Sequence, residues 1–394
     1  MNRMQHVFLV PGFFGFSEFG ELPYFAHVAE LLGARFRDRG WSGRVHRVST
    51  DPTASVPERA RRLAEAIQAV LAAEPGDVHL VGHSSGGLDA RWLVSPHRPD
   101  PEPWLHHVRS VVAVSTPHFG TPVADFFTGA VGRRLLRVLS LATMYTLRYG
   151  KLPLGLAFKL TGVFLRVDDV LRLNRTVLDQ LYEQLLQDFS DDRRQALSRF
   201  FRDVSRDQGL VEQLTPRNMQ TFNATVSDRP GVAYGAVATE ARRPGVGSVW
   251  SAGFDPYAQT THTLYSVLHS LSLRWPSRRV AERPEVPEEQ TDPWLRFMPR
   301  LPDRRSSDGV VPTVSQLHGQ LVHVARADHL DVVGHFADPR HDPPHYDWLA
   351  SGSGFRRSEF ERLWAAVFEF VGAAGGSSDG ASSEVGPTGP AGAP

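Results

Sequence analysis

Cysteine is absent from the chain. Its absence excludes disulfide bonds, zinc sites with thiolate ligands and a cysteine nucleophile. An excess of charge is also lacking, because 43 basic residues balance 43 acidic ones. Domains that bind nucleic acids through charge usually carry a basic excess, so we expect no nucleic-acid partner of that kind.

Long apolar runs are lacking as well. The first run, residues 7–10, is too short for the core of a signal peptide. The most apolar stretch, residues 152–167, contains Pro153, Lys159 and Arg166, and it falls short of the ~20 apolar residues that a membrane-spanning helix needs. The sequence therefore predicts a cytoplasmic protein, or a secreted one if the chain is the mature form of a longer precursor.

The first third of the chain alternates short apolar runs with helical patterns. Buried strands are predicted at residues 6–10, 45–48, 78–81 and 111–114. Ser55 and Glu58 have the S-x-x-E spacing of a capping box, which predicts the start of a helix. This alternation is typical of βαβ units, so we predict an α/β fold with a mostly parallel central sheet and helices on both faces.

The middle of the chain has a different pattern. Residues 126–214 have apolar residues at helical spacing and no convincing strand, and strand patterns return at 232–238 and 321–325. We predict an α/β core of residues 1–127 and 217–371, interrupted by a helical lid or cap at residues 128–216. A last helix is predicted at residues 358–371. Residues 372–394 are mostly Gly, Ala, Ser and Pro, which predicts a disordered tail.

The strongest chemical signal is a G-x-S-x-G motif in the segment GHSSGG, with Ser84 at its centre. The motif directly follows a predicted strand, and residues 88–94 after it can form a helix. A strand, a tight turn and a helix in this order form a nucleophile elbow, so Ser84 is the candidate nucleophile. A glycine-rich loop without chemistry is the alternative.

A serine nucleophile needs a base and a carboxylate that orients the base. In folds with such an elbow, the carboxylate follows the serine in the chain and precedes the histidine. The SDG turn offers Asp308, and His329 follows the apolar run at 321–325. We predict Asp308 as the acid and His329, one of 17 histidines, as the base. Asp328, the sequence neighbour of His329, is the competing acid.

Two backbone N–H groups are needed to bind the oxyanion of the tetrahedral intermediate. Ser85, directly after the nucleophile, is expected to supply one of them. Phe13, in the PGFFG loop after the first strand, is expected to supply the other, although this loop could be an ordinary Pro-Gly turn. Four aromatic residues could line an apolar acyl groove or belong to the core: Phe13, Phe14, Phe16 and Phe119.

Five segments resemble, in order, those of bacterial triacylglycerol lipases and esterases of the α/β-hydrolase superfamily. They are PGFFGF, GHSSGG, VAVSTPHFGTPVADFF, SSDGVVPTVSQLHG and ADHLDVVG. The resemblance covers roughly residues 5–127 and 217–350. It implies an α/β-hydrolase fold in which the fourth segment carries the acid and the fifth the base. Many of these lipases have His-Gly where this chain has Pro11 and Gly12, a change that a backbone oxyanion donor tolerates.

The resemblance also implies a structural calcium ion, because related lipases bind calcium through a carboxylate two residues after the base. Asp331 has that position, and a loop-capping role is its alternative. The matching second carboxylate is not identifiable from the sequence, and the candidates are Glu288, Glu289 and Asp292. No other cofactor is expected, because the chain has no dinucleotide or P-loop fingerprint.

These observations predict a serine carboxylester hydrolase that acts on small-molecule or lipid esters. The insertion, above all residues 135–167, is expected either to open onto a lipid surface as a lid or to remain a fixed cap. An acyltransferase that uses the same three residues is one alternative. A catalytically inactive scaffold that binds a lipid or a partner is the other. The acyl chain length and the oligomeric state are left open.

Overall fold

The structure is a computed structural model. It describes residues 3–13, 24–51, 53–149, 152–164, 175–187, 209–253, 255–338, 347 and 349–376.

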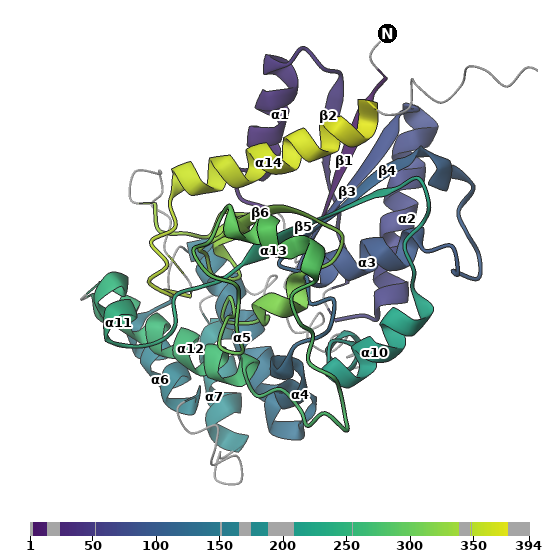
Figure 1. Cartoon of the computed structure of the whole chain (residues 1–394). Coiled ribbons are helices and arrows are strands. Elements are labelled where there is room, and N and C mark those ends of the chain that lie inside the picture. Colours follow the sequence, from purple (N-terminus) through teal and green to yellow (C-terminus); the bar gives the residue numbers. More distant parts are fainter. Residues whose placement is uncertain are drawn as a thin grey trace, which may run out of the picture.

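Within these residues six parallel strands form one sheet, in the order β2-β1-β3-β4-β5-β6 (Figure 1). The strands are β1 (Gln5–Val10), β2 (Gly43–Arg47), β3 (Asp77–His83), β4 (Val108–Val114), β5 (Ala233–Thr239) and β6 (Gln320–Ala325). Each overlaps one of the apolar runs, so the six predicted strands and the parallel sheet are confirmed.

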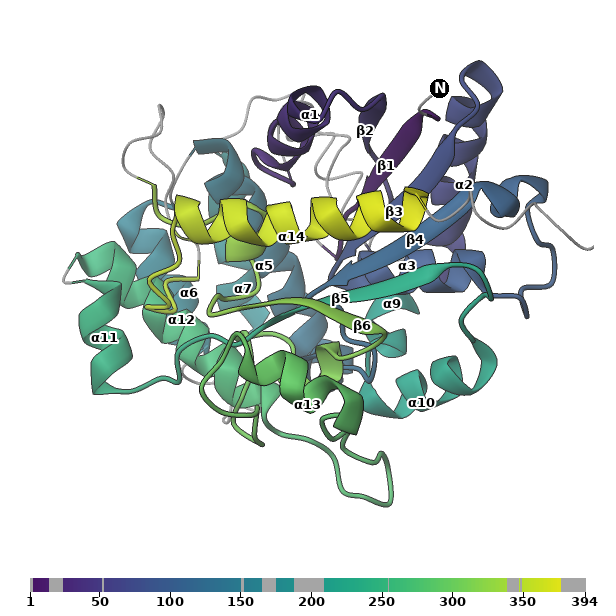
Figure 2. The ribbon, with the colours of Figure 1, turned by 45° about the horizontal axis from the view of Figure 1, so that its top comes forward.

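Successive side chains of the strands pack on opposite faces of the sheet. Val7 and Leu9 join the cluster formed with α1 (Val28–Asp38) and α14 (Arg357–Gly376). Phe8 and Val10 join the cluster formed with α2 (Val56–Ala73) and α3 (Ser85–Val94). Figure 2 shows α14 on one side of the sheet and α2 and α3 on the other. Because both faces are covered, the central strands β1, β3 and β4 are mostly apolar and buried, whereas the edge strand β2 is partly exposed.

Further helices form a layer beyond the carboxyl ends of the strands (Figure 1). The segment between β4 and β5 supplies α4 (Pro122–Thr128), α5 (Ala130–Tyr149), α6 (Leu154–Phe164), α7 (Arg175–Gln187), α9 (Gly209–Gln213) and α10 (Pro216–Thr225). The helical layer thus extends a few residues beyond each end of the predicted insertion, 128–216. The segment between β5 and β6 supplies α11 (Val246–Ala252) and α12 (Pro256–Ser272), whereas its α13 (Glu288–Leu295) packs against β6. Short 3₁₀ helices complete the connections: η1 (Pro103–His107), η3 (Thr313–Gln316) and η4 (Asp331–Val333).

The helical layer is built from two segments of the chain. Helix α12 packs against α4 and α6. Its residues Leu264 and Leu268 belong to the same apolar cluster as Leu136 and Leu181 of the insertion. The sequence pattern predicts a helical layer only for the insertion. It does not reveal that α12 joins this layer, because the apolar residues of α12 pack against the insertion, which is remote in the sequence.

Two local predictions need correction. Helix α2 begins directly after Ser55, as the S-x-x-E spacing predicts, but the side chain of Ser55 makes no capping hydrogen bond. Glu58 pairs with Arg61, and the N–H of Val56 donates to the side chain of Gln213 at 2.7 Å. Helix α14 continues to Gly376, so residues 372–376 of the predicted tail are helical. The rest of that tail, residues 377–394, lies outside the described residues.

None of the helices in the described residues is long and apolar enough to span a membrane.

Candidate active site

Ser84 lies in a tight turn between β3 and α3. Its φ is 54°, a conformation that costs a residue with a side chain about 1–3 kcal/mol. The glycines of the motif make this turn possible, because a Cβ on Gly82 would collide with the backbone of Gly86 and Gly87. The turn therefore holds Ser84 at the carboxyl edge of the sheet, where the motif predicts it.

The loop after β6 brings His329 to this serine. The Nε2 atom of His329 is 3.0 Å from Oγ of Ser84, and its Nδ1 atom is 2.8 Å from Oδ2 of Asp308. A carboxylate can only accept hydrogen bonds, so the ring proton lies on Nδ1 and the lone pair of Nε2 faces the serine hydroxyl. The structure thus brings together the three residues that the sequence analysis selects.

Asp308 is held by the turn that contains it. Its Oδ1 atom accepts hydrogen bonds from the N–H groups of Val310 and Val311, at 2.9 and 2.7 Å. Its Oδ2 atom is also contacted by Thr239 and Gln316, at 3.1 and 3.2 Å. The carboxylate is fully buried, and these donors fix the oxygen that meets His329.

Asp328, the competing acid, has other partners. Its Oδ1 atom accepts hydrogen bonds from the N–H groups of Leu330 and Asp331, at 3.0 and 3.1 Å. Its Oδ2 atom accepts one from Ser351 at 2.8 Å. Asp328 thus caps the loop that carries His329, whereas Asp308 contacts the imidazole.

The loop after β1 lies directly against Ser84. A Cβ on Gly12 would be 2.6 Å from the Cβ atom of Ser84, so only glycine permits this approach. The fully buried Arg59 donates to the carbonyl of Pro11 at 2.6 Å and pairs with the buried Asp89 at 2.8 Å. These contacts fix the loop at Phe13, the predicted oxyanion donor.

Ser85, the other predicted oxyanion donor, is the first residue of α3. The first N–H groups of a helix lack partners within the helix, and its N-terminal dipole favours negative charge nearby. Ser85 is also fully buried. Its position at the helix start is therefore suited to the backbone role that the sequence predicts.

The pocket at Ser84 is small and apolar. It holds about 80 Å³, room for a few water molecules. The insertion contributes Leu136, Val211 and Leu214 to its lining, and Phe13 and Leu330 line it from the core. An apolar pocket that the insertion covers is suited to an acyl chain, although only a short chain fits this volume.

The predicted aromatic groove is only partly present at Ser84. Phe13 lines the pocket, whereas Phe14 and Phe16 lie outside the described residues. Phe119 lines a different cavity and does not line the pocket at Ser84. Among the predicted lid residues, Leu136 lines the pocket and Phe158 is 54% exposed.

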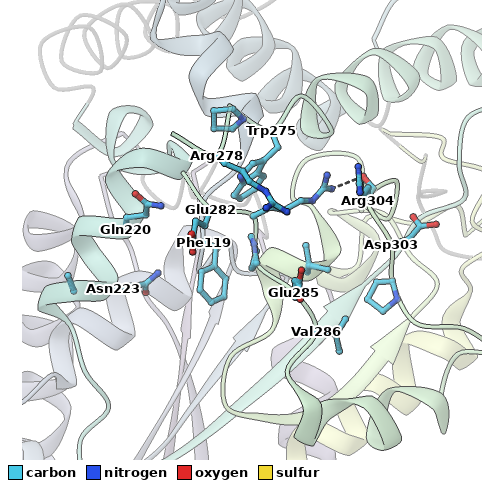
Figure 3. Close-up of a pocket in the computed structure, with 16 residues that line it drawn as sticks. Phe119, Gln220, Asn223, Trp275, Arg278, Glu282, Glu285, Val286, Asp303 and Arg304 are labelled. Carbon is cyan, nitrogen blue, oxygen red and sulfur yellow. Dashed lines mark hydrogen bonds between the residues drawn. The ribbon is translucent and has the colours of Figure 1, made fainter. Parts of the chain in front are cut away.

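That second cavity is much larger, about 1080 Å³, and contains neither Ser84 nor His329. Figure 3 shows Gln220 and Asn223 of α10 on one side of it and Asp303 and Arg304 on the other. Three arginines and three carboxylates line it, among them Arg278, Glu282 and Glu285. Volume alone would select this cavity, but the hydrogen-bonded serine, histidine and carboxylate select the smaller one.

Three carboxylates gather behind the loop that carries His329. Asp328, Asp331 and Asp347 offer ligand atoms that all lie within 4.8 Å of one another. Burial raises the pKa of Asp328 to about 6, and burial together with the neighbouring carboxylates raises the pKa of Asp331 well above its usual value. Asp347 is the partner that the sequence analysis missed.

None of the three carboxylates expected upstream, Glu288, Glu289 and Asp292, belongs to this cluster as the described residues form it. Hard oxygen ligands are those that Ca²⁺ prefers, so the donor set is chemically suited to this ion. Each carboxylate of the cluster also accepts a backbone N–H bond, as the loop-capping alternative requires.

Sequence reasoning also missed two residues next to the proposed base. The Nε2 atom of His83 is 2.8 Å from the carbonyl oxygen of His329, and its Nδ1 atom is 2.7 Å from the hydroxyl of Tyr24. His83 lies inside the quoted GHSSGG motif, which was the available signal. Tyr24 carries no local signal, because it reaches His83 only through the fold.

Comparison with known proteins bears on the fold. No protein-family model and no curated protein matches the chain. The crystal structure of Staphylococcus hyicus lipase matches with a TM-score of 0.51 and 15% identity, over 96% of this chain and 97% of that one. This chain has the α/β-hydrolase fold.

Two other structures match less well. Lipase 1 from Pelosinus fermentans has a TM-score of 0.49 and 16% identity, over 94% of this chain and 99% of that one. EstA from Clostridium botulinum has a TM-score of 0.48 and 18% identity, over 93% of this chain and 87% of that one. At such identities the likeness concerns the fold, and the chemistry has to be argued from the site.

Proposed function

We propose that the protein is a serine hydrolase of carboxylic esters. The observation that carries this proposal is the hydrogen-bonded chain from Ser84 through His329 to Asp308. It begins at a strained turn and opens into an apolar pocket. The lipase-like fold supports hydrolysis of esters in general.

The geometry suits an acyl-enzyme mechanism. Oγ of Ser84 bonds to the ester carbonyl carbon as its proton passes to Nε2 of His329, and Asp308 stabilises the imidazolium. The N–H groups of Phe13 and Ser85 bind the oxyanion. Collapse of this intermediate breaks the bond to the alcohol, which leaves with the proton from His329. Water then gives a proton to His329 as it attacks the acyl carbon. The bond from this carbon to Oγ of Ser84 breaks, Oγ regains the proton from His329, and the acid leaves.

We propose lipid or acylglycerol esters as the substrate class. The pocket lining is apolar, which favours an aliphatic acyl group over a charged one. The small volume of the pocket means that a long acyl chain requires the insertion to move. We therefore propose that the helices over the pocket act as a lid, with a fixed cap and short-chain esters as the alternative.

We also propose that the cluster of Asp328, Asp331 and Asp347 binds calcium. The ion would supply only charge neutralisation and rigidity to the loop that carries His329. Adding millimolar Ca²⁺ to chelator-treated protein should then raise the melting temperature by mass action. Asp331→Asn should remove that response while Glu288→Gln retains it. Equal responses in the two variants would favour the loop-capping role.

A fluorophosphonate probe tests the proposed function most directly. It should label Ser84 in the wild type and leave Ser84→Ala unlabelled, with peptide mapping as the readout. Absence of labelling in the folded wild type would favour the inactive scaffold. Product analysis with an added alcohol separates the other alternative, because an acyltransferase would form a new ester in preference to the free acid.

A further inference from the structure

A second hydrogen-bonded chain runs behind the proposed catalytic residues. It starts at the hydroxyl of Tyr24, which lies against Gly12 of the proposed oxyanion loop. It continues from Tyr24 to Nδ1 of His83 and from Nε2 of His83 to the carbonyl oxygen of His329, at 2.7 and 2.8 Å. This chain therefore connects the proposed oxyanion loop to the backbone of the proposed base.

The direction of every hydrogen bond in this chain follows from its end at His329. A carbonyl oxygen only accepts, so Nε2 of His83 carries the proton. Nδ1 of a neutral imidazole is then an acceptor, and the hydroxyl of Tyr24 must donate to it. Burial lowers the pKa of His83 well below its usual value and raises that of Tyr24. Both groups therefore keep the neutral forms that this arrangement needs.

The hydrogen bonds of Tyr24 and His83 help to hold the backbone of the proposed base in place. The N–H of His329 donates to the carbonyl of Asp308 at 3.0 Å, and its carbonyl accepts from His83. Both backbone groups of His329 are thus held, one by the proposed acid and one by the residue directly before the nucleophile. The rings of His83 and His329 also pack 4.7 Å apart. Movement of His83 would therefore shift His329 relative to Ser84.

The same chain has a consequence for the oxyanion loop. Oη of Tyr24 lies so close to Gly12 that a Cβ there would be 2.7 Å from it. Phe13, the next residue, is the proposed donor. Tyr24 also lines the pocket, so its hydroxyl meets the loop, the pocket and His83 at one point.

We propose that Tyr24 and His83 are positioning residues that hold the base and the oxyanion loop in register with Ser84. This inference rests on the proposed function, because it assigns the two residues to the reaction of Ser84. Misplacement of reacting groups by a fraction of an ångström to about 1 Å lowers rates by up to ~10²-fold without a comparable loss of substrate binding. The expected signature is therefore a fall in kcat with little change in KM.

The test uses the full chain and a short, water-soluble ester, with kcat, KM and melting temperature measured for each variant. Tyr24→Phe removes one hydroxyl and should lower kcat about 10-fold with KM within about twofold. Tyr234→Phe is the matched control, because its partly buried hydroxyl accepts a hydrogen bond from the backbone N–H of Arg229 at the amino end of β5, away from Ser84. The control should lose similar stability and keep kcat.

Variants of His83 separate positioning from packing. His83→Gln retains one donor and one acceptor and should keep most of kcat, whereas His83→Leu retains neither and should lose about 100-fold. Because the two residues act in series, the double variant Tyr24→Phe/His83→Leu should lose no more than His83→Leu alone. If His83→Leu fails to fold, Tyr24→Phe and His83→Gln still decide the question.

Two outcomes would overturn the inference. One is wild-type kcat in Tyr24→Phe, and the other is a change in KM alone, which would make Tyr24 only a part of the pocket wall. Failure of the proposed function is seen separately. Ser84→Ala would then remain active, whatever the variants of Tyr24 and His83 do.

Discussion

Among the described residues, one serine–histidine pair lies beyond the carboxyl edge of the central sheet and another lies within the sheet, toward its amino end. At the carboxyl end, Oγ of Ser84 is 3.0 Å from Nε2 of His329. Toward the amino end, Oγ of Ser110 is 2.8 Å from Nδ1 of His79. The hydrogen-bond lengths are nearly equal, so distance alone does not distinguish a reactive serine from a structural one.

The two pairs differ at the other nitrogen of the imidazole. In His329 it meets the carboxylate of Asp308 at 2.8 Å. In His79 it meets the amide oxygen of Gln5 at 2.7 Å. A carboxylate stabilises the imidazolium that forms when a serine loses its proton, whereas a neutral amide stabilises it far less.

They differ also in backbone and access. Ser84 has a positive φ and lines a pocket, whereas Ser110 lies within β4 and is fully buried. Burial lowers the pKa of His79 to about 4, so this ring resists protonation at neutral pH. The comparison teaches that the pair at Ser84 combines a carboxylate, a strained turn and an opening, whereas the pair at Ser110 has none of the three.

Removal of the two hydroxyls is the sharpest test of this difference. Ser84→Ala should lower ester hydrolysis by ~10⁴–10⁶-fold with the fold intact, as loss of a nucleophile does. Ser110→Ala should keep wild-type kcat and lose about 1 kcal/mol of stability. Steady-state hydrolysis and urea unfolding measure the two effects. More than about a hundredth of wild-type activity in Ser84→Ala would contradict the assignment of the nucleophile.

The role of the carboxylate can be tested next. Asp308→Asn should lower kcat by ~10⁴-fold, because an amide no longer enforces the ring tautomer that leaves Nε2 free. Asp328→Asn alters the cap of the loop and the proposed calcium cluster but leaves the contact of Asp308 with His329, so it should cost less than about tenfold. Both are assayed on a soluble ester, with circular dichroism as the control for folding. The reverse ranking would transfer the role of the acid to Asp328.

The buried pair of Ser110 and His79 should make the free energy of unfolding of the protein depend on pH. The pKa of His79 falls from 6.5 to about 4 on folding, so the unfolded chain binds more protons between these values. The contribution of neutral His79 to the free energy of unfolding is therefore present above pH 6.5 and is lost as the pH falls toward 4. From pH 7 to pH 5 this amounts to about 2 kcal/mol.

His79→Gln lacks the titrating group and serves as the reference. Its free energy of unfolding should fall about 2 kcal/mol less than that of the wild type between pH 7 and pH 5, as measured by urea titration. Equal slopes for the two proteins would mean that His79 titrates as an ordinary histidine, and the contrast between the pairs would then be smaller than proposed.

Access to the carboxyl-end pair should depend on a lipid surface. If the insertion is a lid, activity on a long-chain ester should rise above simple saturation, by about tenfold, once the ester forms micelles. For such a rise, the lipid surface must bind the open form about 1.4 kcal/mol more favourably than the closed form. Rates on either side of the critical micelle concentration provide the measurement. Smooth saturation with a preference for short chains would identify a fixed cap and an esterase.

Local patterns were sufficient for much of the fold. Six apolar runs predicted the six strands because burial on both faces makes the central strands mostly apolar. The S-x-x-E spacing at Ser55 predicted the start of α2 but not its hydrogen bonds. Glu58 pairs with Arg61, and the N–H of Val56 donates to Gln213, which is remote in the chain, so no local spacing reveals that partner.

The sequence by itself determined the candidates for the proposed chemistry. The GHSSGG motif, the SDG turn and the ADHLD segment single out Ser84, Asp308 and His329, since these chemistries need particular residue types next to particular turns. Only the tertiary structure shows that Asp308 contacts the ring of His329 whereas Asp328 caps the loop. It alone joined Asp347 to Asp331, α12 to the insertion and Tyr24 to His83. Such contacts follow from the path of the whole chain, and the side chains involved carry no local signal of the partner that they meet.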